Sequence, residues 1–313
     1  MLLTRTLPPR AMALLQSRVD LTCNPHDRAL TRDDLFRMIA GQHGVVTMLT
    51  DRVDGELLDA APDLKVVANY AVGYNNIDLE AARARGIVVT NTPGVLTDAT
   101  ADLTWALILG ITRRIGEGDR LVRAGRWSGW TPTQLLGMEL RDSVLGIVGM
   151  GRIGRAVASR AGAFGMRVVY AARHPVPNAA PAWRAASLDE LLATADVVSL
   201  HVPLTDATRH LIGSKQLAAM KPAAYLINTS RGPVVDEAAL VEALRLGRIA
   251  GAGLDVYERE PEIQAGLDAC DNTLLLPHLG SATTATRERM GAMVVENVLA
   301  VLEGRRPPNP VEA

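Results

Sequence analysis

Short apolar runs alternate with helical patterns through most of this chain, and this alternation restricts the fold more than any other feature. The strand-like runs cover residues 44–49, 64–69, 87–90, 145–148, 167–171, 196–201, 224–228, 250–256 and 273–276. Strands that alternate with helices are typical of parallel sheets covered by helices. Because 313 residues are long for one core, we expect an α/β protein with two doubly wound parallel-sheet domains.

The helical patterns suggest where those domains divide. Residues 98–114 are hydrophobic nearly all round, which predicts a buried helix. A capping-box pattern at 187–190 predicts the start of another helix. The last helix, about 284–303, carries an apolar side and can return to the first domain. We therefore expect a discontinuous substrate domain of residues 1–97 and 283–313, and a dinucleotide-binding domain of residues 98–282.

Composition excludes several classes of function. A net charge of -1 gives no pull toward nucleic acid or anionic membranes. Only three of the 33 basic residues are lysines, a skew that we attribute to genomic habit. No apolar run is long enough for a membrane span, and Pro8 and Pro9 break the apolar start that a signal peptide would need. Cys23 and Cys270 match no metal spacing, so we expect no metal site and a cytoplasmic protein.

A glycine pattern follows the strand-like run at 145–148. Gly149, Gly151 and Gly154 have the spacing of a dinucleotide-binding loop. The first glycine permits a tight turn, the second lets the backbone approach a pyrophosphate, and the third lets helix and strand pack closely. The pattern alone is weak and also fits a structural turn, but a strand before it and a helix after it favour the binding role. We expect Arg152 and Ile153 to line the same site.

The strand that follows this helix bears on the choice of cofactor. NAD binding favours an acidic residue about 20 residues after the glycines, yet residues 169–174 contain none. Arg173 can pair with a 2′-phosphate, with help from His174. We therefore expect NADP(H) to be preferred, with NAD(H) as the alternative. A solvated surface arginine is the other interpretation.

Four separated motifs carry a family resemblance. They are Gly149–Gly154, Asn228–Gly232, Gly253–Pro261 and Pro277–Ala282. With them, the chain resembles the D-isomer-specific 2-hydroxyacid dehydrogenase family, and most closely its glyoxylate/hydroxypyruvate reductase branch. The resemblance runs from Val66 to Gly304. It implies a flavodoxin-like substrate domain and a Rossmann cofactor domain with a cleft between them, and a homodimer.

The resemblance implies three catalytic residues. Arg231 would bind the substrate carboxylate, for which a guanidinium fork is well shaped. His278 would exchange a proton with the substrate, because its ordinary pKa lies near working pH. Glu260 would hydrogen-bond His278 and favour the imidazolium. Each has a simpler interpretation: a surface ion pair for Arg231, a structural histidine for His278, and a solvated charged loop for Glu260.

The resemblance also implies substrate contacts outside these three residues. The backbone N–H groups of Val72 and Gly73 would hold the carboxylate, although a plain turn after a strand is the alternative. Trp130 would reach the neighbouring subunit's substrate site, and packing at a dimer surface is the equal alternative. The further cofactor-lining residues that the resemblance implies are Thr104, His201, Pro203, Ser230, Asp255 and Gly280.

Together these features predict NAD(P)H-dependent reduction of small 2-keto acids such as glyoxylate or hydroxypyruvate to D-2-hydroxy acids. Reduction of 2-ketogluconate or another 2-keto acid is the alternative within the enzyme class. A nucleotide-sensing protein that resembles transcriptional co-repressors is the alternative outside it. Glu260 argues against formate dehydrogenase, which has glutamine in that place. A chain that ends soon after its last helix argues against phosphoglycerate dehydrogenases with a regulatory domain.

Overall fold

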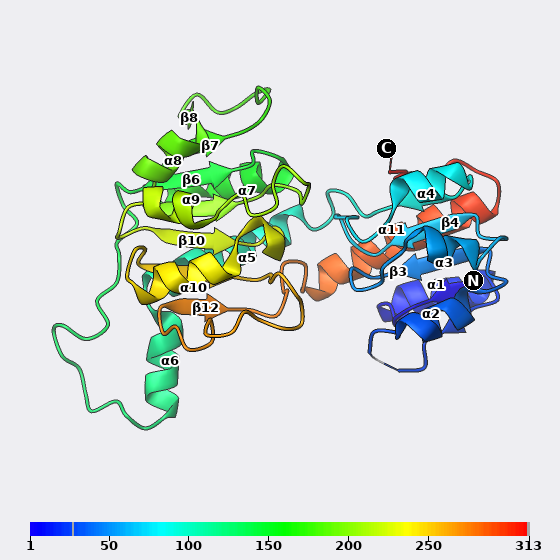
Figure 1. The fold of residues 1–313 in the computed structure, drawn as a ribbon, viewed down its shortest axis with the longest axis horizontal. Coiled ribbons are helices and arrows are strands. Elements are labelled where there is room, and N and C mark those ends of the chain that lie inside the picture. The colour runs from blue at the N-terminus through cyan, green and yellow to red at the C-terminus, as the bar shows by residue number, and fades with distance from the viewer. Residues whose placement is uncertain (27, 312–313) are drawn as a thin grey trace. The chain divides into compact units, whose positions relative to one another are not determined.

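The computed structural model describes residues 1–26 and 28–311 and divides into two compact units (Figure 1). The first unit comprises Met1–Leu96 and Ser281–Ala313, and the second comprises Thr97–Gly280. The boundaries expected from the sequence lie after residues 97 and 282. Among the described residues, no helix is both long and apolar enough to span a membrane.

The first unit contains a five-stranded sheet in the order β2-β1-β3-β4-β5, and its neighbouring strands are all parallel. This is the flavodoxin-like strand order. The strands are β1 (Leu2–Leu3), β2 (Thr22–Cys23), β3 (Gly44–Thr47), β4 (Val66–Asn69) and β5 (Val88–Thr90). The helices are α1 (Pro9–Arg18), α2 (Arg32–Ile39), α3 (Gly55–Asp59), α4 (Leu79–Ala84) and α11 (Thr284–Leu302).

Helix α11 returns from the end of the chain to complete the first unit. It contacts α1, β3 and β4, and its buried residues include Met290, Val294 and Val298. Gly291 lets two helices approach closely, since a Cβ atom there would lie 2.7 Å from the Cβ atom of Ala11 in α1. The apolar side that the sequence placed on this helix thus packs into the core of the first unit.

The second unit contains a seven-stranded sheet in the order β12-β11-β10-β9-β6-β7-β8, again with parallel neighbours. Read from β8, this is the Rossmann order, which reverses between β6 and β9. The strands are β6 (Val144–Val148), β7 (Arg167–Ala171), β8 (Trp183–Ala185), β9 (Val197–Leu200), β10 (Tyr225–Asn228), β11 (Gly251–Leu254) and β12 (Thr273–Leu275). The predicted fold class, two parallel α/β domains, is confirmed.

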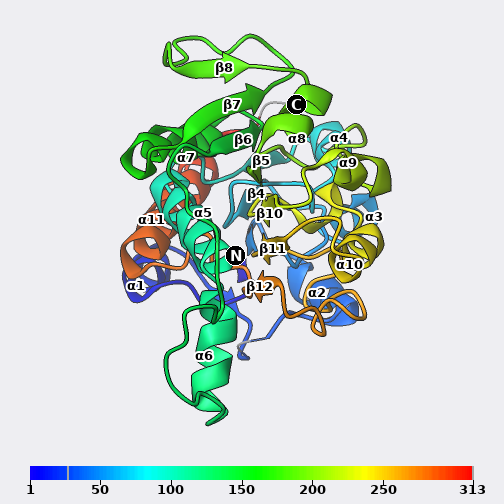
Figure 2. The same cartoon turned by 90° about the vertical axis from the view of Figure 1, so that its left-hand side faces the viewer.

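Helices cover both faces of the second sheet (Figure 2). One face carries α5 (Thr97–Thr112) and α7 (Arg152–Arg160), and the other carries α8 (Leu188–Thr194), α9 (Ser214–Ala219) and α10 (Glu237–Arg245). The strands are therefore buried on both sides, which explains their continuous apolar runs. Helix α8 begins as predicted, because the Ser187 hydroxyl accepts the N–H of Glu190 at 3.2 Å. The Glu190 carboxylate pairs with Arg184 instead of completing the capping box.

Helix α1 begins at Pro9, which occupies its first position. Two parts of the structure differ from the sequence expectation. The helix expected after the glycine loop ends at Arg160, and the chain continues as the 3-10 helix η1 (Ala161–Phe164), which Gly165 ends with a φ of 68°. Helix α6 (Ile115–Arg123) was not expected and extends away from the rest of the second unit in both views (Figures 1 and 2).

Candidate active site

The glycine loop after β6 is too tight for side chains at two of its three glycines. Gly149 has a φ of 96°, and a Cβ atom there would lie 2.7 Å from the carbonyl carbon of His201. A Cβ atom at Gly154 would lie 2.1 Å from the carbonyl oxygen of Gly149. At Gly151, which precedes α7, an added Cβ atom would meet nothing within 4 Å. The loop is therefore open at the helix start, where N–H groups and the helix dipole can hold phosphates, and it fits a dinucleotide.

The end of β7 presents two basic side chains. Arg173 and His174 follow the strand and are both exposed, and Nε of Arg173 lies 3.2 Å from Nε2 of His174. Strand β7 pairs with β6, so its carboxyl end and the glycine loop share one edge of the sheet. This is where the ribose of a dinucleotide lies in Rossmann folds.

Arg231 lies in a short loop between β10 and the 3-10 helix η2 (Gly232–Val234). Asn228 fixes this loop: its Oδ1 accepts the N–H of Ser230 at 3.0 Å, and its Nδ2 donates to the carbonyl oxygen of Arg231 at 3.0 Å. Burial lowers the pKa of Arg231, and the charge of Glu260 opposes that shift. A partly desolvated guanidinium favours the approach of an anion.

Glu260 and His278 form a hydrogen-bonded pair. Nδ1 of His278 lies 2.9 Å from Oε2 of Glu260, and both side chains are 32% exposed. The other carboxylate oxygen accepts the N–H of Tyr257 at 3.0 Å. Burial raises the pKa of Glu260, but the hydrogen bond and charge of His278, the Tyr257 N–H and the charge of Arg231 together lower it below its ordinary value. Glu260 therefore favours its ionised form beside the His278 ring.

Asp255 holds the turn that carries His278. Its Oδ1 accepts the N–H of Leu279 at 2.6 Å, and its Oδ2 accepts the N–H of Gly280 at 2.8 Å. His278 takes a left-handed φ of 55°, a conformation that is uncommon outside glycine and is often found at functional sites. Burial raises the pKa of Asp255, against the effect of these N–H groups and of the charge of His278.

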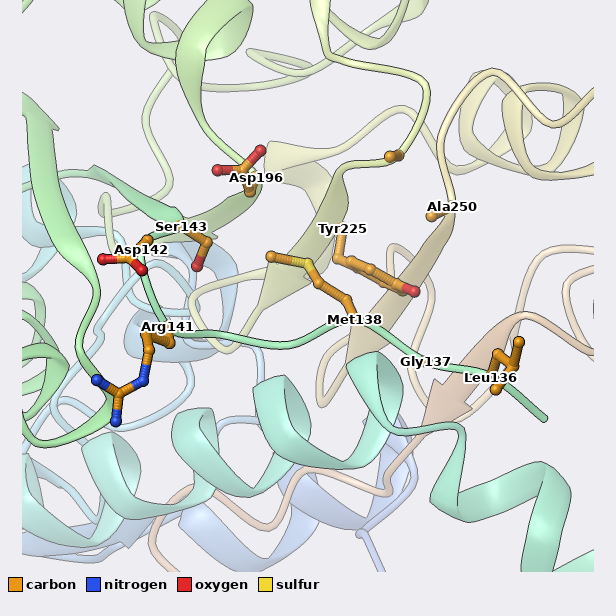
Figure 3. A pocket seen from close by; sticks show the side chains of 10 residues that line it. Leu136, Gly137, Met138, Arg141, Asp142, Ser143, Asp196, Tyr225 and Ala250 are labelled. Atoms are coloured by element: carbon orange, nitrogen blue, oxygen red, sulfur yellow. The ribbon is translucent and has the colours of Figure 1, made fainter. Parts of the chain in front are cut away.

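The loops described above all lie at one edge of the second sheet. The glycine loop, Arg231, Glu260 and His278 follow the carboxyl ends of β6, β10, β11 and β12, and those strands are parallel. A separate pocket of about 480 Å³ lies at the opposite edge, where Ser143, Asp196 and Tyr225 mark the amino ends of β6, β9 and β10 (Figure 3). In open α/β sheets ligands bind at the carboxyl edge, so we place the active site there.

Comparison with known proteins agrees with this geometry. Residues 105–280 match the model of the "D-isomer specific 2-hydroxyacid dehydrogenase, NAD binding domain" family. A glyoxylate reductase of Thermococcus litoralis is 49% identical over 313 residues, covering 98% of this chain and 95% of that protein. The chain belongs to the D-isomer specific 2-hydroxyacid dehydrogenase family. It is therefore an oxidoreductase with a nicotinamide-cofactor domain.

Solved structures of similar proteins support the family assignment. The TT0316 protein of Thermus thermophilus is 53% identical and has a TM-score of 0.93, with 99% of each chain covered. An NADPH-dependent glyoxylate/hydroxypyruvate reductase of Sinorhizobium meliloti, solved with NADP and malonate, is 36% identical and has a TM-score of 0.87. The match covers 99% of this chain and 95% of that one.

The residues predicted to line the cofactor site differ in their exposure to solvent. Gly151, Arg152, Arg173, His174 and Pro203 are exposed, and Gly149, Ile153 and His201 are half-buried. The buried ones are Thr104, Gly154, Ser230, Asp255 and Gly280.

Several of these side chains already have partners inside the protein. The Thr104 hydroxyl donates to the carbonyl oxygen of Thr100 at 2.8 Å and lies 2.9 Å from the hydroxyl of Thr229. The Ser230 hydroxyl donates to Oδ1 of Asn228 at 2.8 Å. Burial lowers the pKa of His201 to about 3, so its ring, which lies 2.9 Å from the Ser199 hydroxyl, is neutral. Their roles toward a cofactor remain predictions.

The predicted substrate loop belongs to the first unit, where three consecutive carbonyl groups each accept a hydrogen bond. The carbonyl oxygens of Ala71, Val72 and Gly73 accept from the N–H of Thr92 at 2.8 Å, Nδ2 of Asn91 at 2.7 Å and Nδ2 of Asn69 at 2.7 Å. In a trans peptide the N–H points opposite to the C=O. The N–H groups of Val72 and Gly73 therefore point away from these partners, as an anion-binding backbone requires.

Trp130 lies in the segment after α6 and is 81% exposed. Trp127 and Leu136 in the same segment are also exposed. A side chain this open to solvent is not packed among the other predicted site residues of the second unit, and the role of Trp130 remains a prediction.

Sequence reasoning did not find the residues that support the site. Asn69 and Asn91 hold the substrate loop, and Glu237 lies buried behind the Glu260 segment. Asn91 stands in a turn-like Asn-Thr-Pro-Gly stretch, and Glu237 begins a helix, where an acidic residue is common. The local sequence predicts only a turn at Asn91 and a helix start at Glu237. Their contacts with the site are visible only in the tertiary structure.

Proposed function

We propose that this protein reduces small 2-keto acids such as glyoxylate and hydroxypyruvate to D-2-hydroxy acids, with NADPH preferred over NADH. The hydrogen bond of 2.9 Å between His278 and Glu260, on the same sheet edge as Arg231 and the glycine loop, carries this proposal. The activities named for the similar glyoxylate reductases agree with it.

Each catalytic residue has a distinct task in this proposal. Arg231 and the N–H groups of Val72 and Gly73 bind the substrate carboxylate, and Arg231 also polarises the keto oxygen. The bound nicotinamide supplies the hydride that forms the new C–H bond. His278 donates its Nε2 proton to the keto oxygen, and Glu260 stabilises the imidazolium before that transfer. In the oxidative direction His278 accepts the same proton.

Several contacts would hold the cofactor. Gly149, Gly151 and Gly154 shape the phosphate site at the start of α7, with Arg152 and Ile153 beside them. Arg173, assisted by His174, would bind the 2′-phosphate of NADP(H). We assign the remaining cofactor contacts to Thr104, His201, Pro203, Ser230, Asp255 and Gly280.

We also propose that the protein is a homodimer. Helix α6 has no buried residue, and the exposed apolar side chains of this helix and the following segment are Ile115, Val122, Trp127, Trp130 and Leu136. Exposed apolar surface of this extent favours a protein partner, and a second copy would cover it. Trp130 would then reach the partner subunit's substrate site. The two free cysteines fit a reducing compartment, so we place the protein in the cytoplasm.

One parallel assay tests the proposed function. Purified protein is mixed with NADPH or NADH and, in turn, with glyoxylate, hydroxypyruvate, pyruvate and 2-ketogluconate, and loss of reduced cofactor is followed by absorbance. We expect the highest kcat/KM with NADPH and glyoxylate or hydroxypyruvate. Equal or better rates with NADH would contradict the 2′-phosphate assignment. Nucleotide-dependent assembly without any keto-acid reduction would instead favour a nucleotide-sensing protein.

A further inference from the structure

The segment that carries Glu260 is attached to one buried carboxylate. Glu237 is the first residue of α10 and is 3% exposed. Its Oε1 accepts the N–H of Glu258 at 2.9 Å. Glu260 lies two residues after this attachment point in the sequence.

The attachment is reciprocal. Oε1 of Glu258 accepts the backbone N–H of Glu237 at 2.9 Å, and Oε2 of Glu258 lies 3.1 Å from Nε2 of His210. Gly232 lies against the same segment, since a Cβ atom there would be 1.9 Å from the carbonyl carbon of Tyr257. The segment around Glu260 is thus fixed from α10 and from the loop next to Arg231.

The chemistry of this position favours a carboxylate over an isosteric amide. The backbone N–H of Glu258 needs an acceptor, and a carboxylate offers two acceptor oxygens and no donor. Burial raises the pKa of Glu237, the N–H groups of Glu258 and Gln264 lower it, and the charges of Glu258 and Glu260 raise it further. Holding three carboxylates in one region opposes stability, which indicates that the arrangement serves the site.

We propose that Glu237 is a positioning residue of the active site: it holds the backbone at Glu258 so that the Glu260 carboxylate stays within hydrogen-bond distance of His278. Its kinetic consequence rests on the proposed reductase function, whereas its structural consequence does not. Without Glu237 the Glu260 carboxylate moves, and the imidazolium loses its partner.

The test compares Glu237→Ala and Glu237→Gln with Glu242→Gln as the matched control. Glu242 lies on the same helix but is exposed, and it pairs only loosely with Arg248 at 3.5 Å. NADPH and glyoxylate are the substrates. We expect kcat/KM to fall about 100-fold for Glu237→Ala, because small misplacements of reacting groups have effects of that order. Glu237→Gln keeps one acceptor oxygen, so its kcat/KM should lie between those of Glu237→Ala and wild type. NADPH affinity should stay within about twofold, since the glycine loop is not involved.

Two further measurements separate positioning from general stability. Reduction needs the proton of His278, so the pH dependence of kcat/KM in both Glu237 variants should differ from that of wild type and Glu242→Gln. Hydrogen–deuterium exchange of the intact protein should accelerate in residues 257–264 of both variants. That second measurement needs no turnover, so it remains decisive if wild type reduces no keto acid and the proposed function fails.

Unchanged exchange in residues 257–264, or an unchanged pH profile together with wild-type kcat/KM, would overturn the proposal. A lowered melting temperature with both the pH profile and the exchange of this segment unchanged would also overturn it, because it would assign Glu237 a purely structural role. If Glu237→Ala fails to fold, the nearly isosteric Glu237→Gln carries the same comparison.

Discussion

Asp255 fixes the backbone of His278 in an uncommon conformation. The N–H of His278 donates to the carbonyl oxygen of Asp255 at 3.0 Å, and the Asp255 carboxylate binds the next two N–H groups of the turn. His278 thereby keeps its left-handed φ of 55°. The imidazole that we propose to be catalytic is presented by a strained turn whose conformation a buried aspartate maintains.

Replacing Asp255 with asparagine should therefore damage both stability and catalysis. Asparagine keeps the shape but offers one acceptor oxygen where two N–H groups need one. An unsatisfied buried N–H costs about 1–3 kcal/mol, so urea unfolding should show a loss of that size. The kcat/KM for keto-acid reduction should fall by about tenfold or more as the His278 turn relaxes. Wild-type stability and kcat/KM would show that the Asp255 carboxylate does not hold this turn.

Gly232→Ala should disturb the site from the other side. The added methyl group would lie 1.9 Å from the carbonyl carbon of Tyr257, so the Arg231 and Glu260 segments must separate. We expect a loss of about 1–3 kcal/mol in stability and a marked loss of kcat/KM, with NADPH binding retained. Gly162→Ala is the control, because a Cβ atom at Gly162 meets nothing within 4 Å. If Gly232→Ala and Gly162→Ala have equal stability and equal kcat/KM, the close contact between Gly232 and Tyr257 is refuted.

How far the sequence predicts this fold depends on the length of each element. The strand, glycine loop and helix from Val144 to Arg160 were predicted because a buried strand, a glycine spacing and a helical pattern agree there. Strands β1 and β2 have two residues each, and no periodicity can be read from two residues. Helix α6 was missed because Gly116 and Gly118 lower the helix propensity of this short segment.

The candidate site likewise contains residues that the sequence predicts and residues that it does not. Arg231, Glu260 and His278 could be proposed because family motifs surround them, and the structure brings Glu260 and His278 into contact. Glu237 and Asn91 could not, because their importance comes from backbone groups that are distant in sequence. Such contacts depend on how loops meet at one sheet edge, which a local pattern does not encode.

The pKa of Glu260 predicts a pH-dependent contribution to stability. Its folded-state pKa is lowered, chiefly by His278 against the effect of burial. A carboxylate of this kind stabilises the fold above its unfolded-state pKa, and the contribution is lost as pH falls through the folded-state pKa. Wild type should therefore exceed Glu260→Gln in unfolding free energy by more at about pH 7 than at about pH 3. A difference that does not change with pH in urea unfolding would contradict the assignment.

Arg173 should set the cofactor preference. Arg173→Ala should raise the KM for NADPH about tenfold or more, because a charge-assisted contact to the 2′-phosphate is lost, and should change the KM for NADH little. Arg167→Ala is the matched control, since Arg167 is an exposed arginine at the opposite end of the same strand. If the KM values for both cofactors respond equally in Arg173→Ala, Arg173 does not read the phosphate.

The most direct measurement of the central claim is keto-acid reduction by His278→Ala beside wild type, with NADPH affinity measured on the same preparations by fluorescence. Loss of the general acid should lower kcat for glyoxylate or hydroxypyruvate by about 100- to 10,000-fold. NADPH affinity should remain near that of wild type, because the glycine loop is untouched. Wild-type turnover in His278→Ala would contradict the account, since the proton would then come from another group.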